Sequence, residues 1–138
     1  KEFVSLGLRS LQRLQEQGAV LKRLALENLE SYPAAWLEEI LDRSGYRLCC
    51  DLGHLLMQGA DLLEVYGRNR SRTGIMHLHG VCERDGAPKG HVGLHRLPAG
   101  SLPQIKTILD DFQGVLCLEV FNFEDLRASL AVLEELLD

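Results

Sequence analysis

The chain has 138 residues, of which 46% are apolar and 25% are charged, and its formal net charge is −5. These values are typical of a soluble globular protein, and the length predicts a single domain spanning residues 1–138. They exclude collagen-like, disordered and disulfide-scaffold proteins, and no apolar run reaches the ~18–20 residues of a membrane span. The acidic balance argues against broad nucleic-acid binding, which usually requires a basic surface.

The N-terminal stretch and the cysteines both predict a cytoplasmic protein that does not associate with membranes. Residues 1–20 form a charged amphipathic stretch without the compact apolar segment of a signal peptide. No CxxC pair occurs, so reduced thiols are expected rather than a zinc ribbon or a disulfide framework. The cysteines are Cys49, Cys50, Cys82 and Cys117.

Helical and strand patterns alternate along the chain. The stripe from Val4 to Leu14 predicts a first helix. Apolar runs bounded by turn residues then predict strands that are buried on both faces, as in a parallel sheet. These runs are Ala19–Glu27, Arg47–Asp51, Gly74–His79 and Gly114–Val120. The segment Val81–Gly100 is predicted to be a long loop after the third strand.

Helical patterns separate the predicted strands. One includes Trp36 and Ile40 and ends at Gly45. Another follows a capping box of Ser101 and Gln104 with a proline in its first turn. Asn122 is expected to cap the last helix, whose buried face is predicted from its leucines. These are Leu126, Leu130, Leu133 and Leu137.

One helix followed by repeated β-α units predicts an α/β fold with a parallel sheet and right-handed connections. The spacing of the units suits a (β/α)8 barrel, which has ~250 residues and roughly 31 per unit. The predicted fold is therefore the C-terminal half of a (β/α)8 TIM barrel, built from four parallel β-α units. A doubly wound sheet is the alternative, but no glycine-rich dinucleotide loop follows the first strand.

Each predicted strand ends in a residue type that binds metals. Active sites of α/β barrels and open parallel sheets lie at these carboxyl ends. Carboxylates gathered there would repel one another, and a divalent cation would remove that repulsion. Mixed Asp, Glu and His ligands suit Mn, Zn, Fe or Mg. The residues are Glu27, Asp51 with the nearby His54, His77 with His79, and Glu119.

Each of these residues alone also has an ordinary structural interpretation. Glu27 could lie in a loop, Asp51 could cap a helix that begins near His54, and His77 or His79 could be a satisfied barrel-interior histidine. The joint pattern over consecutive strands is what predicts a metal or acid-base site.

The predicted loop Val81–Gly100 leaves the same end of the sheet as the candidate site. His91 is its best metal-ligand candidate, and its basic side chains are candidates for binding a substrate phosphate. A solvated loop is the alternative for these basic residues, which are Arg84, Lys89 and Arg96. The basic segment Arg68–Arg72 precedes a strand, so we interpret it as a solvated turn at the opposite end.

Several short motifs resemble the second half of the xylose isomerase-like barrels. They are Glu27-Asn28, Asp51-Leu-Gly-His54, His77-Leu-His79, His91 and Glu119. That superfamily includes sugar isomerases, epimerases and apurinic endonucleases (AP endonuclease family 2). The resemblance implies a divalent-metal site whose ligands are Glu27, Asp51, His54, His77, His91 and Glu119. Lys89 stands where the endonuclease branch carries an Asp.

Within that superfamily the chain is most similar to cobamide-remodelling phosphodiesterases. The similar segments are Leu26-Glu-Asn-Leu29, Cys50–Leu56, His77-Leu-His79, Cys117-Leu-Glu-Val-Phe121 and Leu126–Leu130. This resemblance implies a metal-dependent hydrolase that cleaves a phosphodiester, with the nucleotide loop of a cobamide as its substrate.

The first functional hypothesis is therefore metal-dependent phosphodiester hydrolysis, with Glu27, His79 and Glu119 as catalytic residues. The second is isomerisation or epimerisation of a sugar or sugar phosphate, with Glu27 and Glu119 as acid-base partners. The third is a non-catalytic half-barrel that serves as an interaction module. Because an isolated half-barrel exposes two sheet edges, we expect a partner. It would be either a missing N-terminal half, which the start at Lys1 favours, or a second copy, and the fragment alone should be inactive.

Overall fold

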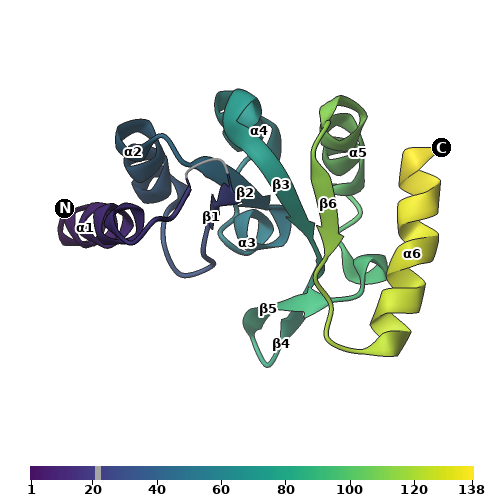
Figure 1. Ribbon diagram of the computed structural model, residues 1–138. Coiled ribbons are helices and arrows are strands. Elements are labelled where there is room, and N and C mark those ends of the chain that lie inside the picture. The colour runs from purple at the N-terminus through teal and green to yellow at the C-terminus, as the bar shows by residue number, and fades with distance from the viewer. Residues whose placement is uncertain (21–22) are drawn as a thin grey trace.

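A computed structural model describes residues 1–20 and 23–138 (Figure 1). In this described part, four strands form a parallel sheet in the order β1-β2-β3-β6, and two more form an antiparallel hairpin, β4-β5. The sheet strands are β1 (Ala25–Glu27), β2 (Arg47–Asp51), β3 (Thr73–Leu78) and β6 (Val115–Leu118). The hairpin strands are β4 (Gly80–Arg84) and β5 (Ala87–Val92).

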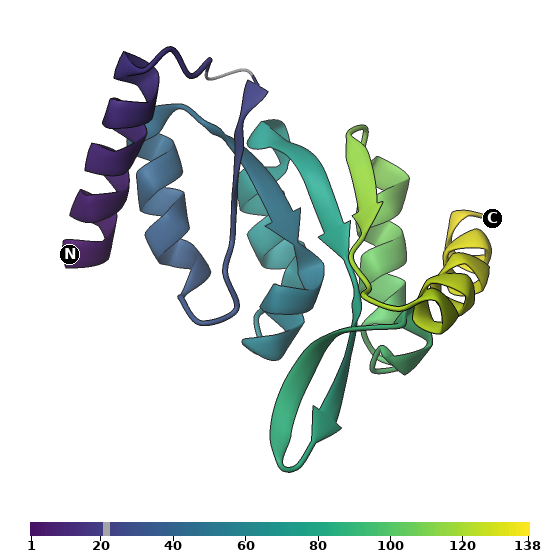
Figure 2. The same cartoon turned by 60° about the horizontal axis from the view of Figure 1, so that its bottom comes forward.

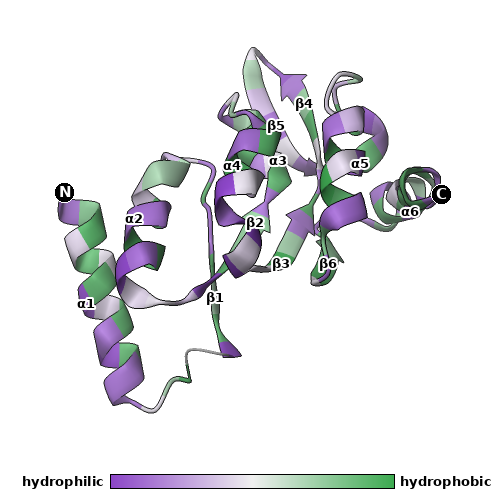
Figure 3. Cartoon of the chain, turned by 90° about the horizontal axis from the view of Figure 1, so that it is seen from above, coloured by the Kyte–Doolittle hydropathy of each residue, from purple (hydrophilic) through white to green (hydrophobic). Residues whose placement is uncertain are grey.

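Helices alternate with the sheet strands. Figure 3 shows α2, α4 and α5 along one face of the sheet, with α1 and α6 at the two flanks. The helices are α1 (Glu2–Glu16), α2 (Ala34–Ser44), α3 (Leu52–Met57), α4 (Leu62–Asn69), α5 (Leu102–Asp111) and α6 (Phe123–Leu137), with short 3-10 turns η2 (Arg70–Arg72) and η3 (Leu94–Arg96). The predicted α/β architecture of parallel β-α units is confirmed.

The apolar core lies between the sheet and the helices on one face. Strand side chains alternate between the two faces, so Cys50 and Met76 point toward the helices and are fully buried. Ile105 and Ile108 of α5 pack into the same core. The other face, here called the inner face, is open at β6, where Val115 is 64% exposed. The two faces of the sheet therefore differ: one packs against the helices, and the other bears the polar side chains described below.

Two predictions about the strands are wrong: the extent of the first strand and the loop after the third. The first strand does not extend over the whole of Ala19–Glu27, because among the described residues of that run only Ala25–Glu27 pairs with β2. Residues 21–22 of that run lie outside the described residues. Val81–Gly100 is not a loop but contains most of the β4-β5 hairpin. Asp85 and Gly86 join its strands with φ of 56° and 77°, the left-handed pair that a tight two-residue hairpin turn requires.

The predicted helix ends are mostly confirmed, but one cap and one helix face are wrong. Gly45 ends α2 in a left-handed conformation, and Asn122 Oδ1 accepts the Asp125 N–H at the start of α6. Ser101 does not cap α5, because its hydroxyl donates to the Pro98 carbonyl instead.

The buried face of α6 differs from the predicted row of leucines. Leu130 and Leu137 are exposed, and Ser129 and Leu136 are buried. Ser129 Oγ accepts the Leu94 N–H at 3.0 Å and donates to the Asp125 carbonyl at 2.6 Å. These hydrogen bonds turn the Ser129 side of the helix toward the protein.

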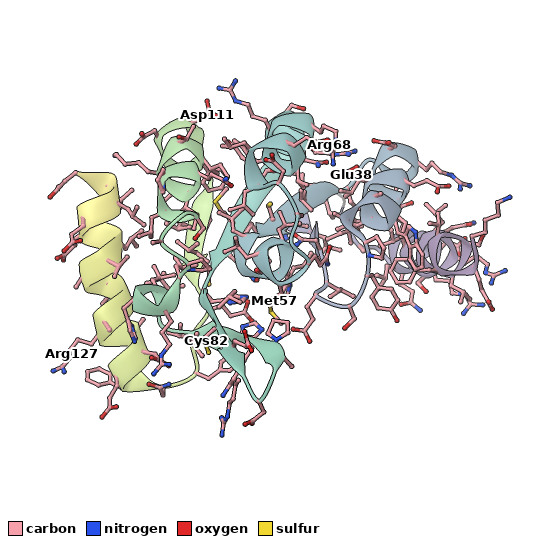
Figure 4. The ribbon with its side chains drawn as sticks, turned by 180° about the vertical axis from the view of Figure 1, so that it is seen from behind. Glu38, Met57, Arg68, Cys82, Asp111 and Arg127 are labelled. Atoms are coloured by element: carbon pink, nitrogen blue, oxygen red, sulfur yellow. The ribbon has the colours of Figure 1, made fainter. Side chains whose placement is uncertain are left out.

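The basic segment Arg68–Arg72 lies at the end of the fold opposite the hairpin, but it is only partly the predicted solvated turn, because it includes the end of α4 and the buried Asn69. Arg68 pairs with Glu38 and Glu64, and Arg70 pairs with Asp111. Figure 4 shows Glu38, Arg68 and Asp111 at the opposite end from Met57 and Cys82, which lie near the hairpin. Within residues 1–20 and 23–138, no helix combines the length and the apolar character needed to cross a membrane.

Candidate metal centre

The carboxyl ends of the parallel strands bring the predicted metal ligands together. Figure 2 shows the arrowheads of β2, β3 and β6 pointing toward the end of the sheet from which the hairpin projects. Asp51 is directly opposite His77 in the β2-β3 register, and the Glu119 N–H donates to the Leu78 carbonyl just beyond β6. One potential ligand atom from each of four residues lies within 4.8 Å of all the others. These residues are Glu27, Asp51, His77 and Glu119, here called the carboxylate group.

His77 lies at the middle of the carboxylate group. Its Nδ1 is 3.0 Å from Glu119 Oε2 and 3.4 Å from Glu27 Oε1. The same nitrogen is 3.9 Å from Asp51 Oδ2. Because Glu27 comes from β1 and Glu119 follows β6, the two glutamates approach this nitrogen from opposite edges of the sheet.

The polar atoms of this group fit a bound cation. Among the described residues, Asp51 Oδ2, His77 Nδ1 and Glu119 Oε2 are buried atoms without a hydrogen bond, although His77 Nδ1 lies close to Glu119 Oε2. Buried polar atoms in proteins are nearly always satisfied, so several such atoms converging on one point indicate a ligand. A divalent cation would satisfy all of them and neutralise the carboxylates. The donor set suits Mn or Mg, and Zn or Fe are also compatible with it.

Asp51 is the most deeply buried ligand candidate, with no exposed surface. Burial alone would raise its pKa, but the His79 imidazole and the His54 N–H outweigh burial and lower the pKa of this carboxyl. The His54 N–H donates to Asp51 Oδ1 at 2.7 Å, and His79 Nε2 lies 3.2 Å from the same oxygen. Asp51 therefore stays ionised, with one oxygen held by the protein and the other free to bind a cation. It also caps α3, so the predicted capping role is confirmed, while metal binding by this residue stays a prediction.

Asn28 anchors Asp51 through the backbone, a role that sequence reasoning missed. Its side chain donates to the Asp51 carbonyl at 2.9 Å and accepts the Asp51 N–H at 2.8 Å. Its own carbonyl lies 2.8 Å from His54 Nδ1, which orients that ring. The position of Asn28 in the sequence, directly after Glu27 at the end of a strand, could have indicated this role. A buried side-chain amide at such a position can replace the hydrogen bonds of the strand ladder.

Replacing Asn28 by Ala should destabilise the protein and weaken metal binding together. The change leaves the buried Asp51 N–H and C=O unsatisfied, which costs about 1–3 kcal/mol for each group. Urea denaturation measures the loss, and calorimetric titration with Mn²⁺ measures the affinity. The Asn122→Ala variant, which loses the cap of α6, should be destabilised by about 1 kcal/mol with its metal affinity unchanged. Equal effects of both substitutions on metal affinity would contradict the role of Asn28.

Three histidines form a second group beside the carboxylates. His54, His79 and His91 each offer a nitrogen within 4.8 Å of the others. The His79 and His91 rings are stacked with centroids 4.2 Å apart, and the His91 N–H donates to His79 Nδ1 at 2.9 Å. His79 is fully buried, and although burial lowers its pKa, the carboxylate of Asp51 raises it more strongly. His79 therefore joins Asp51 to the hairpin that carries His91.

The hairpin places His91 in an unusual backbone conformation. Its φ is 55°, a left-handed value that costs a non-glycine residue free energy and recurs at functional sites. The ring of Phe121 stacks on His91 with centroids 4.9 Å apart and is itself 75% exposed. Phe121 is a second residue that sequence reasoning missed as part of the site, although it lies two positions after Glu119.

The predicted phosphate-binding residues are all exposed on or beside the hairpin. Arg84 lies at the hairpin turn with its Nε 3.7 Å from Asp85 Oδ2, and Lys89 is opposite Cys82 in the hairpin register. Arg96 lies in η3. Binding of a substrate phosphate by these residues stays a prediction.

Cys49 lies beneath the carboxylate group on the inner face. It is opposite Glu27 in the β1-β2 register, and its sulfur is within 4.8 Å of potential ligand atoms of Glu27 and His77. Burial raises the pKa of the Cys49 thiol to about 12, and the charges of Glu27 and Asp51 act in the same direction. The thiol is therefore protonated at neutral pH unless a cation is bound.

Comparison with known proteins identifies the fold. No protein-family model and no curated protein matches the sequence. Among solved structures, the chain is similar to a xylose isomerase domain protein from Planctomyces limnophilus, with a TM-score of 0.69 and 17% sequence identity. The match covers 98% of this chain and 51% of that protein, so the chain spans about half its length. The described chain thus has the fold of one half of a xylose isomerase-like (β/α)8 barrel.

Proposed function

We propose that this chain carries the metal centre of a divalent-metal-dependent isomerase or epimerase that acts on a sugar or sugar phosphate. The observation that supports this proposal best is the placement of Glu27 and Glu119. Their carboxylates lie 3.4 Å and 3.0 Å from the same nitrogen of His77 but come from opposite edges of the sheet. Two carboxylates arranged in this way can reach the two faces of one substrate carbon.

A cation held by the carboxylate group would polarise the carbonyl of the substrate. One glutamate takes the proton from the carbon next to that carbonyl. In epimerisation the other returns a proton to the opposite face of the same carbon; in isomerisation the hydroxyl proton passes to the carbonyl oxygen and a proton returns to the former carbonyl carbon. The atoms of the substrate are conserved, and only the configuration or the position of the carbonyl changes. Asp51 and His77 would hold the metal together with the two glutamates, while Asn28 and His79 keep Asp51 in place. The similarity to a xylose isomerase domain protein supports the same class of substrate.

Phosphodiester hydrolysis, with a cobamide as the substrate that the sequence resemblance implies, is the second candidate. The observation that favours it is the histidine group of His54, His79 and His91 beside the carboxylate group. Two neighbouring cation positions would suit the in-line displacement of a phosphate ester, in which each cation stabilises one oxygen. The exposed basic residues of the hairpin would then help to neutralise the phosphate.

We further propose that activity requires a complementary half-barrel. The chain spans about half of the structure it resembles, and β6 leaves its outer edge and inner face open. The complement would be other β-α units of the same protein or a second copy of this chain. A non-catalytic interaction module would bind such a partner without turning over a substrate.

Exchange of deuterium from solvent distinguishes these functions. The chain, assayed within its complete barrel in D₂O with Mn²⁺, should incorporate deuterium into ketoses, aldoses or their phosphates at the carbon next to the carbonyl. Glu27→Gln and Glu119→Gln should each lower the exchange rate roughly 10²–10⁴-fold, which is the usual contribution of a positioned acid or base. Glu124→Gln, a substitution in the first turn of α6, is the control and should keep full exchange.

Cleavage of a phosphodiester without deuterium exchange would replace the isomerase proposal by the hydrolase. Neither reaction, in a preparation that binds a partner half-barrel, would support the interaction module.

A further inference from the structure

We propose that Cys49 is a metal ligand that acts only with thiophilic cations. A cation such as Zn²⁺, Co²⁺ or Cd²⁺ would be held by Glu27, Cys49 and His77. A hard cation such as Mn²⁺ or Mg²⁺ would be held by the carboxylate group instead. This inference rests on the proposed metal site and concerns which cation that site selects.

The first support is the placement of the sulfur. Cys49 is 5% exposed and faces the inner side of the sheet, since it pairs with Glu27 and lies two residues before Asp51. Its Sγ and the nearest ligand atoms of Glu27 and His77 are within 4.8 Å of one another. Ligand atoms around a tetrahedral zinc, with bonds of ~2.0–2.3 Å, are roughly 3.5 Å apart. Small side-chain movements therefore bring these three atoms to coordination distance.

The second support is independent of the cysteine. Asp51 is fully buried, and its Oδ2 has no hydrogen-bond partner. This oxygen lies 3.9 Å from His77 Nδ1 and so points into the space that Glu27 and His77 also face. Asp51 belongs to the carboxylate group and not to the group that contains Cys49, so its oxygen supports a cation beside Glu27 and His77, the two residues that the groups share.

The two possible ligand sets share Glu27 and His77 and differ in their remaining donors. One adds carboxylate oxygens, which suit hard cations, and the other adds a sulfur, which soft cations prefer. When the sulfur–metal bond forms, the thiol releases its proton to solvent, and no atom is oxidised or reduced. Hard and thiophilic cations would therefore bind to different sets of donors around Glu27 and His77.

The test measures metal binding by the purified protein, using optical absorption for Co²⁺ and titration for Cd²⁺ and Mn²⁺. Bound Co²⁺ should show its visible ligand-field bands together with a near-ultraviolet sulfur-to-cobalt charge-transfer band. Cys49→Ser should remove the charge-transfer band and keep the ligand-field bands. It should also weaken Cd²⁺ binding by roughly 10–100-fold or more, the scale seen when even a supporting residue of a metal site is lost. Mn²⁺ affinity should not change.

Cys117→Ser is the matched control, because Cys117 lies on the same face, opposite His77, but is exposed. This variant should keep the charge-transfer band and the Cd²⁺ affinity of the parent protein. Ligand-field bands without a charge-transfer band in the parent protein would overturn the role of Cys49 and leave the proposed metal site intact. The absence of any bound Co²⁺, Cd²⁺ or Mn²⁺ would overturn the metal site and this inference together.

Discussion

Replacing Asp51 by Asn should lower the affinity for Mn²⁺ at least about 100-fold, which corresponds to roughly 2.8 kcal/mol of binding free energy. Asp51 is fully buried, and its Oδ2, like Glu119 Oε2, has no hydrogen-bond partner among the described residues, so this oxygen depends strongly on a cation. The asparagine keeps an oxygen that can accept the His54 N–H at the start of α3. The change therefore removes the charge and largely preserves the helix cap. Calorimetric titration and elemental analysis after dialysis measure the effect.

Asp61→Asn is the control for this experiment. Asp61 caps α4 by accepting the Glu64 N–H at 3.0 Å, as Asp51 caps α3, but it belongs to none of the three groups of potential metal ligands. Its replacement should leave the metal affinity unchanged and alter stability by a similar small amount. If Asp51→Asn retained the parent's metal content, the carboxylate group would not be the metal site.

Replacing Gly53 by Ala should destabilise the protein by about 1–3 kcal/mol, the range for an overpacked core. Gly53 lies in α3 directly beneath the buried His79 ring, and a Cβ there would lie 2.1–2.4 Å from three atoms of that ring. The ring has little freedom to retreat, because Asp51 and the backbone N–H of His91 hold its two nitrogens. Metal affinity should fall as well, because a displaced His79 ring would no longer hold the Asp51 carboxylate in place. Urea denaturation and Mn²⁺ titration measure the two effects.

Gly67→Ala makes the same chemical change but should raise the stability of the protein instead of lowering it. Gly67 lies inside α4, and a Cβ there would meet no atom within 4 Å. Because alanine is the better helix former, this variant should be more stable by about 0.5–1 kcal/mol. The contrast isolates the contact with His79 from the general effect of a methyl group in a helix.

The double variant Gly53→Ala/His79→Ala tests the contact itself. Removing the ring removes the clash, so the double variant should lose less stability than the sum of the two single variants. Coupling of 0.5–3 kcal/mol is the usual range for residues in contact. Additive losses would show that Gly53 is required for another reason.

The ends of the sheet strands could be predicted because they depend on local sequence. Glu27, Asp51 and Glu119 each follow a short apolar run, and parallel strands bring such residues to one edge. The hairpin was missed, although Asp85-Gly86 is a typical dipeptide of a two-residue hairpin turn. Its strands contain Gly80, Pro88 and Gly90, which have low strand propensity, and they pair only because the turn and their packing against α3 and η3 support them.

The contacts within the site depend on features that hydrophobic patterns do not encode. An irregularity between Leu48 and Cys49 shifts the β2-β3 register and so determines that Asp51 lies opposite His77. The part played by Asn28 arises from a buried amide that bridges to the next strand. The face that α6 buries likewise depends on the polar contact between Ser129 and the Leu94 N–H as well as on Leu133 and Leu136.

The two faces of the sheet offer different prospects for protein engineering. Residues such as Cys50 and Met76, which point to the helices, are fully buried, so large-to-small changes there would cost about 2–5 kcal/mol. On the inner face, Val115 and Cys117 of β6 are exposed, and the chain gains little packing energy from them. A library that varies these two positions would explore new chemistry beside the metal ligands with little loss of folded protein.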